Sequence, residues 1–72
     1  DKDFLKKVKS THPSLTNNDL RLCAYLRLNL SSKDIAPLLN ISLSIVEIKR
    51  YRLRKKMQLT HNEGLTDHLL SL

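Results

Sequence analysis

The apolar side chains of this 72-residue chain recur at the spacing of amphipathic helices, in five consecutive segments. The first is a short helix predicted over residues 3–9, and the pair His12-Pro13 closes it. A residue that precedes proline is driven out of helical geometry, so the break is expected there. Residues 1–14 are therefore interpreted as a leading helix and connector, and residues 15–72 as the core of one domain.

The second segment is opened by Thr16 and closed by Asn29. Thr16 is a good N-cap, and Asp19 three residues later can complete a capping box. Asn29 tolerates the left-handed backbone that ends many helices. Between these signals the sequence predicts a buried stripe made of Leu20, Leu22, Cys23, Leu26 and Leu30.

The next two helices are predicted to meet at a tight turn. Ser31 or Ser32 caps a short helix that Asn40 ends, and Ser42 caps a helix over residues 43–57. The core positions of this longer helix are Val46, Leu53 and Met57. Two short helices joined in this way form a helix-turn-helix.

A last helix is predicted over residues 63–72, with Leu65, Leu69 and Leu72 on one stripe and Leu70 beside it. These leucines cap the core in the simplest interpretation. Four leucines in so short a segment exceed what a thin core needs, so the stripe is also a candidate dimer surface. The whole pattern predicts an all-α fold, a small four-helix domain with a short leading N-terminal helix.

Composition supports helices and excludes several classes of protein. Leu supplies 16 of the 72 residues, whereas Gly occurs once, so hairpin turns are scarce. No apolar run reaches the roughly 18 residues of a membrane span, and no membrane contact is expected. The single cysteine, Cys23, cannot form an internal disulfide and is interpreted as a small buried hydrophobic residue.

Charge gives the first indication of function. The chain carries 13 Lys and Arg against 7 Asp and Glu, a net charge of +6. Most of this excess lies in the segment 43–57, which holds Lys49, Arg50, Arg52, Arg54, Lys55 and Lys56 against a single acid, Glu47. Charge concentrated on one helix favours a polyanionic partner, although a solvated helix face explains it equally well.

Motifs of catalysis and of metal binding are missing from the sequence. No nucleophile elbow or Gly-rich loop is present, so no enzyme and no catalytic residue is expected. The three histidines, His12, His61 and His68, lack the spacing of metal ligands. We therefore expect no metal, no cofactor and no bound small molecule.

A more specific pattern runs from Leu15 to Met57. It consists of Leu15-Thr16, Leu22-Cys23, Leu26, the run Leu30-Ser31-Ser32-Lys33-Asp34-Ile35-Ala36, Leu39, Ile41-Ser42, Val46, Leu53 and Lys56-Met57. Over these 43 residues, without a gap, the chain resembles the LuxR/GerE-type helix-turn-helix domain, in a form similar to variants of Bacteroidetes-type bacteria. It departs from the family pattern at Asn29, Pro37, Ile45, Glu47 and Lys49.

The resemblance implies the C-terminal output domain of a longer bacterial transcription regulator, which binds double-stranded DNA in the cytoplasm with helix 43–57 in the major groove. Base contacts are then expected from Glu47, Ile48 and Tyr51. Phosphate contacts are expected from Ser32, Lys33, Ser44, Arg50, Arg52, Arg54 and Lys55. Two copies would pair weakly on DNA through Leu65, Leu69 and Leu72.

Two other interpretations use the same basic helix. The first is a helical protein-interaction module whose basic face meets an acidic partner, and salt-sensitive DNA binding would separate it from the regulator. The second is the σ-factor region that reads promoter elements, which shares the helix-turn-helix. The leading helix and the Leu15-Thr16 opening favour the LuxR-type interpretation over the σ-factor region.

Overall fold

The computed structural model describes residues 2–59 and 64–72. This part of the chain is all-helical, which confirms the predicted fold class, including the short leading helix. Its five helices are α1 (Lys2–Thr11), α2 (Asn17–Arg27), α3 (Ser32–Leu39), α4 (Leu43–Lys56) and α5 (Leu65–Leu70).

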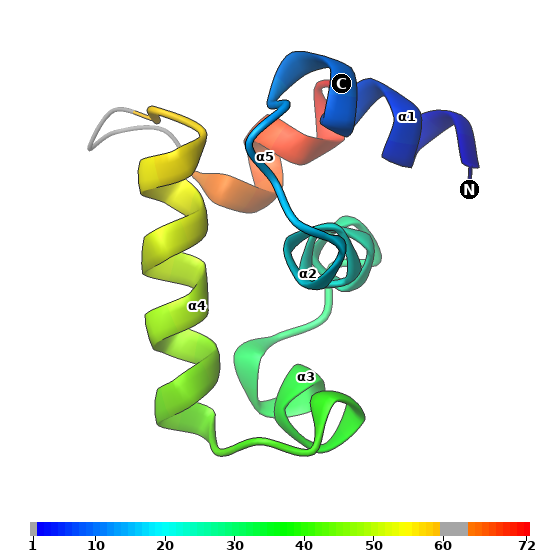
Figure 1. Ribbon diagram of the computed structural model, residues 1–72. Helices are drawn as coiled ribbons and strands as arrows, with labels where there is room; N and C mark the ends of the chain where they lie inside the picture. The colour runs from blue at the N-terminus through cyan, green and yellow to red at the C-terminus, as the bar shows by residue number, and fades with distance from the viewer. Residues whose placement is uncertain (1, 60–63) are drawn as a thin grey trace.

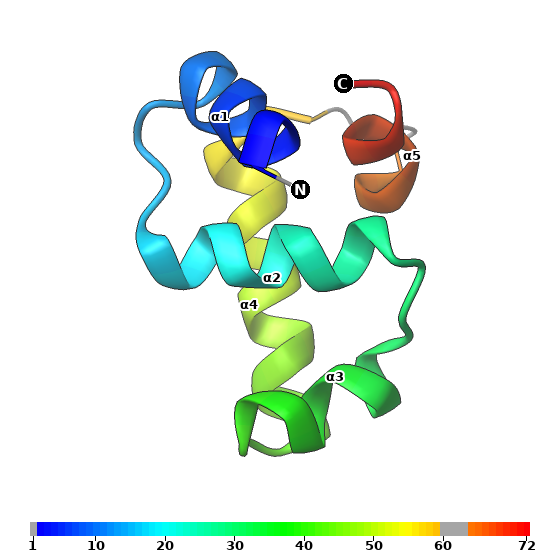
Figure 2. The ribbon, with the colours of Figure 1, turned by 90° about the vertical axis from the view of Figure 1, so that its right-hand side faces the viewer.

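The helices are arranged around α2. Figure 1 shows α2 end-on in the middle, with α3 below it, α1 and α5 above it, and α4 upright along one side. Figure 2, turned by 90°, shows α2 crossing in front of α4. Both chain ends therefore lie at the end of the domain formed by α1 and α5, and α3 lies at the opposite end.

Every helix contributes side chains to one core. The buried apolar residues are Phe4, Val8, Leu15, Leu22, Cys23, Leu26, Ile35, Ala36, Val46, Leu53, Met57, Leu65 and Leu69. The predicted stripe of α2 is confirmed at its centre, while Leu20 and Leu30 are half-buried at its edges. Burial, followed by the charge of Asp19, raises the pKa of the Cys23 thiol to about 12, so this residue stays a protonated thiol in the core.

The helix starts follow the local chemistry of their capping residues. Thr16 Oγ1 accepts from the Asp19 backbone N–H at 3.2 Å, and Asp19 Oδ2 accepts from the Thr16 N–H at 2.9 Å, which is the predicted capping box. At α3 the cap is Ser31, which exchanges the same pair of hydrogen bonds with Asp34. The choice between Ser31 and Ser32 is thereby settled.

Left-handed residues close three helices. Asn29 and Asn40 have φ values of 62° and 56°, as predicted for the residues that end α2 and α3. Gln58 also has a positive φ, 56°, beyond the end of α4. Asn40 begins the three-residue turn, 40–42, that joins α3 to α4, so a single left-handed residue reverses the chain there.

Two predicted helix bounds were wrong. The first helix continues to Thr11, because Pro13 does not disturb the residues before His12. The last helix, α5, ends at Leu70 and does not reach residue 72. Its predicted start at Glu63 lies outside the described residues.

One polar contact joins α5 to the connector between α1 and α2. The Nε2 atoms of His12 and His68 lie 3.1 Å apart, and both side chains are half-buried. Partial burial, and after it the charge of His68, lowers the pKa of His12 from its ordinary value. A contact between two imidazoles accommodates one proton, because a second would place two N–H donors face to face.

This pair makes stability depend on pH. The pKa of His12 is lower in the folded state than in the unfolded state, so the unfolded state takes up the proton first as pH falls. The free energy of unfolding is therefore expected to be highest above the unfolded pKa of about 6.5 and to decrease as pH falls below it. Chemical denaturation of the wild type and of His12→Gln at a series of pH values measures this. The wild type should lose more stability than the variant on acidification, and parallel profiles would contradict the assignment.

Candidate nucleic-acid interface

The helix α4 is held by one narrow stripe of buried side chains. Val46 and Leu53 are fully buried and Met57, its C-cap, is 4% exposed. Ser42 starts the helix by accepting the Ile45 N–H on its Oγ at 3.3 Å. Because an α-helix repeats every 3.6 residues, anchoring one stripe leaves the opposite side of α4 exposed.

We define the outward face of α4 as Ser44, Glu47, Ile48, Tyr51 and Lys55, all of which are exposed. Ile48 and Tyr51 are 46% and 59% exposed, so this face has an apolar centre. The Lys55 Nζ lies 4.8 Å from the centroid of the Tyr51 ring, a cation–π contact that orders both side chains. The three residues predicted to contact bases thus share one surface.

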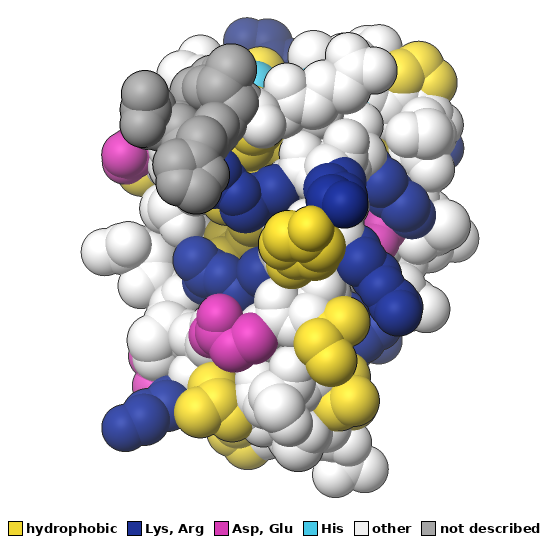
Figure 3. All heavy atoms as spheres, turned by 90° about the vertical axis from the view of Figure 1, so that its left-hand side faces the viewer, with side chains coloured by type: hydrophobic (Ala, Val, Ile, Leu, Met, Phe, Trp, Pro, Cys, Tyr) yellow, Lys and Arg dark blue, Asp and Glu magenta, His cyan; other side chains and the backbone are white. Residues whose placement is uncertain are grey.

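Cationic side chains surround this apolar centre. Figure 3 shows the side of the molecule that α4 presents, where Lys and Arg side chains lie around a group of apolar ones and an acidic side chain lies among them. Arg52 is exposed and Arg54 is half-buried, so both contribute to the rim along the second half of α4. An apolar centre with a cationic rim is suited to a polyanion that also carries apolar groups.

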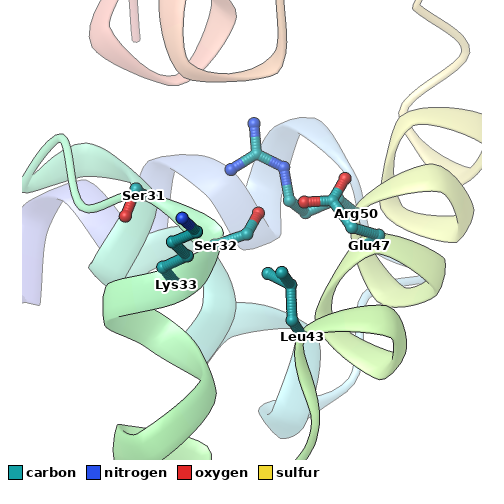
Figure 4. A pocket seen from close by; sticks show the side chains of 6 residues that line it. All are labelled: Ser31, Ser32, Lys33, Leu43, Glu47 and Arg50. Atoms are coloured by element: carbon teal, nitrogen blue, oxygen red, sulfur yellow. The ribbon is translucent and has the colours of Figure 1, made fainter.

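One hollow of this surface lies between the start of α3 and α4, with a volume of about 450 Å³. Figure 4 shows Lys33 from α3 on one side of this hollow and Glu47 and Arg50 from α4 on the other. We call it the α3–α4 hollow, and it is lined by Ser31, Ser32, Lys33, Leu43, Glu47 and Arg50. Three of the predicted phosphate contacts, Ser32, Lys33 and Arg50, are therefore brought together.

A second hollow, of about 180 Å³, lies on the other flank of α4. We call it the α2–α4 hollow, and its lining residues are Asn18, Arg21, Leu39, Ile41 and Lys49. Two cations, Arg21 and Lys49, line it without an acid. Neither was predicted as a contact residue, and for Arg21 the only signal in the sequence is a charge on the polar side of another helix.

Lys56 differs from the other basic residues of α4. Its Nζ contacts Asp19 Oδ2 at 2.6 Å, and the same carboxylate caps α2. Partial burial raises the pKa of Asp19, but hydrogen bonds from Lys56 and Thr16 outweigh it and lower the pKa overall. Lys56 therefore ties the end of α4 to the start of α2.

The predicted dimer surface is corrected by the structure. Leu65 is 3% exposed and Leu69 is fully buried, so both belong to the core of the single chain. Leu72, beyond the end of α5, is half-buried, and only Leu70 is well exposed, at 56%. The short helix α5 packs against α2. Leu65 and Leu69, which were predicted to contact a second copy, are buried within the single chain.

Metal binding and membrane insertion are two other roles that a short helical chain could have. Within residues 2–59 and 64–72, no three His, Cys, Asp or Glu side chains cluster to hold a metal ion. No helix in this part of the chain has the length and apolar character to cross a membrane. Comparison with family models, with curated proteins and with solved structures finds no match. The geometry of α4 and its two hollows is therefore the feature of the molecule from which its function is inferred.

The corrected role of α5 leads to opposite expectations for neighbouring leucines. Leu69→Lys places an uncompensated charge in the core, which costs about 3–5 kcal/mol, a large part of the stability of a small domain. Leu70→Lys changes an exposed side chain and should shift stability by less than about 0.5 kcal/mol. Urea denaturation followed by circular dichroism compares the two. Equal stability of the two variants would contradict the burial of Leu69 in the core.

Proposed function

We propose that this chain is the DNA-binding domain of a bacterial transcription regulator, with α4 as the helix that enters the major groove of double-stranded DNA. The observation that carries the proposal is the outward face of α4, whose exposed apolar, acidic and basic side chains lie between two hollows that each hold two cationic side chains. The resemblance to the LuxR/GerE-type domain supports the same function. A cytoplasmic location is expected for a domain of this kind.

The dimensions of α4 favour duplex DNA among polyanions. An α-helix with its side chains is about 10–12 Å across, and the major groove of B-DNA is about 12 Å wide. The major groove of an RNA helix is too deep and narrow for side chains to read. With α4 in the groove, Lys33 and Arg50 would meet one phosphate backbone, and Arg21 and Lys49 would meet the other.

The outward face supplies groups that distinguish bases. The Glu47 carboxylate can accept a hydrogen bond from the amino group of cytosine, and the Ile48 side chain can contact the methyl group of thymine. Tyr51 offers a hydroxyl that both donates and accepts. Ser44 is the second residue of α4, close to the connection 40–42 with α3, and its hydroxyl suits a phosphate contact.

A protein partner is the competing function. The exposure of Leu43, Ile45 and Ile48, at 42%, 42% and 46%, would also suit an amphipathic acidic helix. Such a complex would bury Ile48 of the outward face together with Leu43 and Ile45 on its two sides. The two functions differ in what the cationic hollows meet, phosphates along a duplex or carboxylates on a helix, and binding to short duplexes at several salt concentrations separates them.

The affinity for DNA should depend strongly on the salt concentration. With four to six phosphates neutralised, the logarithm of the DNA affinity should fall with the logarithm of salt with a slope of about −4 to −5, at roughly −0.9 per phosphate. Arg21→Met and Arg50→Met should each weaken binding to all sequences and make the slope shallower by about 1. Lys6→Met removes the same charge from an exposed position of α1 and serves as the matched control. A flat salt response of the wild type, or an equal change in the control, would contradict the proposal.

The preferred DNA sequence should depend on Glu47. Duplexes selected from a random pool by the wild type should contain a C·G pair whose preference depends on Glu47. Glu47→Gln keeps the size of the side chain and removes the carboxylate, so discrimination at that pair should fall by about 1–3 kcal/mol. Affinity for unrelated DNA should not weaken, because a negative charge is removed. Repeating the selection with the variant checks this, and an unchanged preference at every position would remove Glu47 from the base contacts.

A further inference from the structure

The fold brings two imidazole nitrogens together from positions 56 residues apart. His12 follows α1, where its backbone N–H donates to the Val8 carbonyl at 2.8 Å, and His68 belongs to α5, where its N–H donates to the Gly64 carbonyl at 2.9 Å. The Nε2 atoms are 3.1 Å apart, and the ring centroids are 5.3 Å apart with the planes at 59°. Both side chains are half-buried, so solvent reaches the pair.

This distance is close to the separation of two ligands on one metal ion. Zn²⁺ binds imidazole nitrogen at about 2.0–2.1 Å, so two nitrogens at a tetrahedral ion lie about 3.3 Å apart. Turning the two rings by small side-chain rotations would direct both lone pairs at one ion placed beside the line that joins the nitrogens. Water would complete the coordination, since within the described residues no third His, Cys, Asp or Glu joins the pair.

We propose that His12 and His68 form an exchangeable two-histidine site for a divalent transition metal ion such as Zn²⁺, which ties α5 to the connector between α1 and α2. This inference does not depend on DNA binding. The helix α5 has six residues and its N-cap, Gly64, makes no side-chain cap hydrogen bond, so a cross-link at His68 would stabilise a weakly capped element. An ion that binds the folded chain raises its stability by mass action.

Thermal unfolding of the chain, followed by circular dichroism, tests the site with ZnCl₂ as the probe. At neutral pH the Tm of the wild type should rise by several degrees with increasing Zn²⁺ and return when EDTA is added. The same concentrations of Mg²⁺, which prefers oxygen ligands, should leave the Tm unchanged. His12→Gln and His68→Gln should abolish the rise, whereas His61→Gln, which removes the third histidine, should keep it.

A second readout covers the case in which a variant folds poorly. In the NMR spectrum of the wild-type chain, Zn²⁺ should shift or broaden the ring signals of His12 and His68 and leave those of His61 in place. No rise in the Tm of the wild type, a rise that persists in both His12→Gln and His68→Gln, or a response confined to His61 would each overturn the proposal. If the ring signals of His12 and His68 change with pH but not with Zn²⁺, the two side chains share a proton and do not bind the metal.

Discussion

The burial of Val46, Leu53 and Met57 is the constraint on which the rest of the structure depends. These three side chains fix the rotation of α4 about its own axis, because they are the part of the helix that enters the core. With that rotation fixed, Ile48 and Tyr51 must face away from the domain. The packing of α3 against α4 then places Lys33 and Arg50 around one hollow, so a single apolar stripe determines both the outward face and its cationic flank.

The charge of α4 is arranged unevenly around this stripe. Lys56 is neutralised by Asp19, and Lys55 lies over the Tyr51 ring, whereas Arg50 and Lys49 line hollows that hold one acid or none. Like charges that line one hollow, Lys33 with Arg50 and Arg21 with Lys49, repel each other and reduce the stability of the free domain. A polyanion bound as proposed would relieve this repulsion.

Local chemistry was sufficient to predict the helices, since Thr16, Asn29 and Asn40 act on the backbone within a few residues of their own positions. The outward positions of α4 followed from its periodicity for the same reason. The role of the α5 leucines could not be predicted in this way. Their spacing shows that one side of the helix is apolar, but not whether α2 or a second copy packs against that side. The position of Arg21 near Lys49 and the contact of His12 with His68 both arise where segments distant in sequence pack together. Local sequence patterns do not predict which distant segments meet.

The most direct test of the central claim is an NMR titration of the chain with a duplex selected from a random pool. The account predicts that the largest amide shifts fall on two groups of residues, the outward face of α4 and the linings of the α3–α4 and α2–α4 hollows. The amides of α1 and α5, on the opposite end of the domain from α3, should shift little. Shifts concentrated on α1 and α5, or none on α4 at saturating DNA, would contradict it.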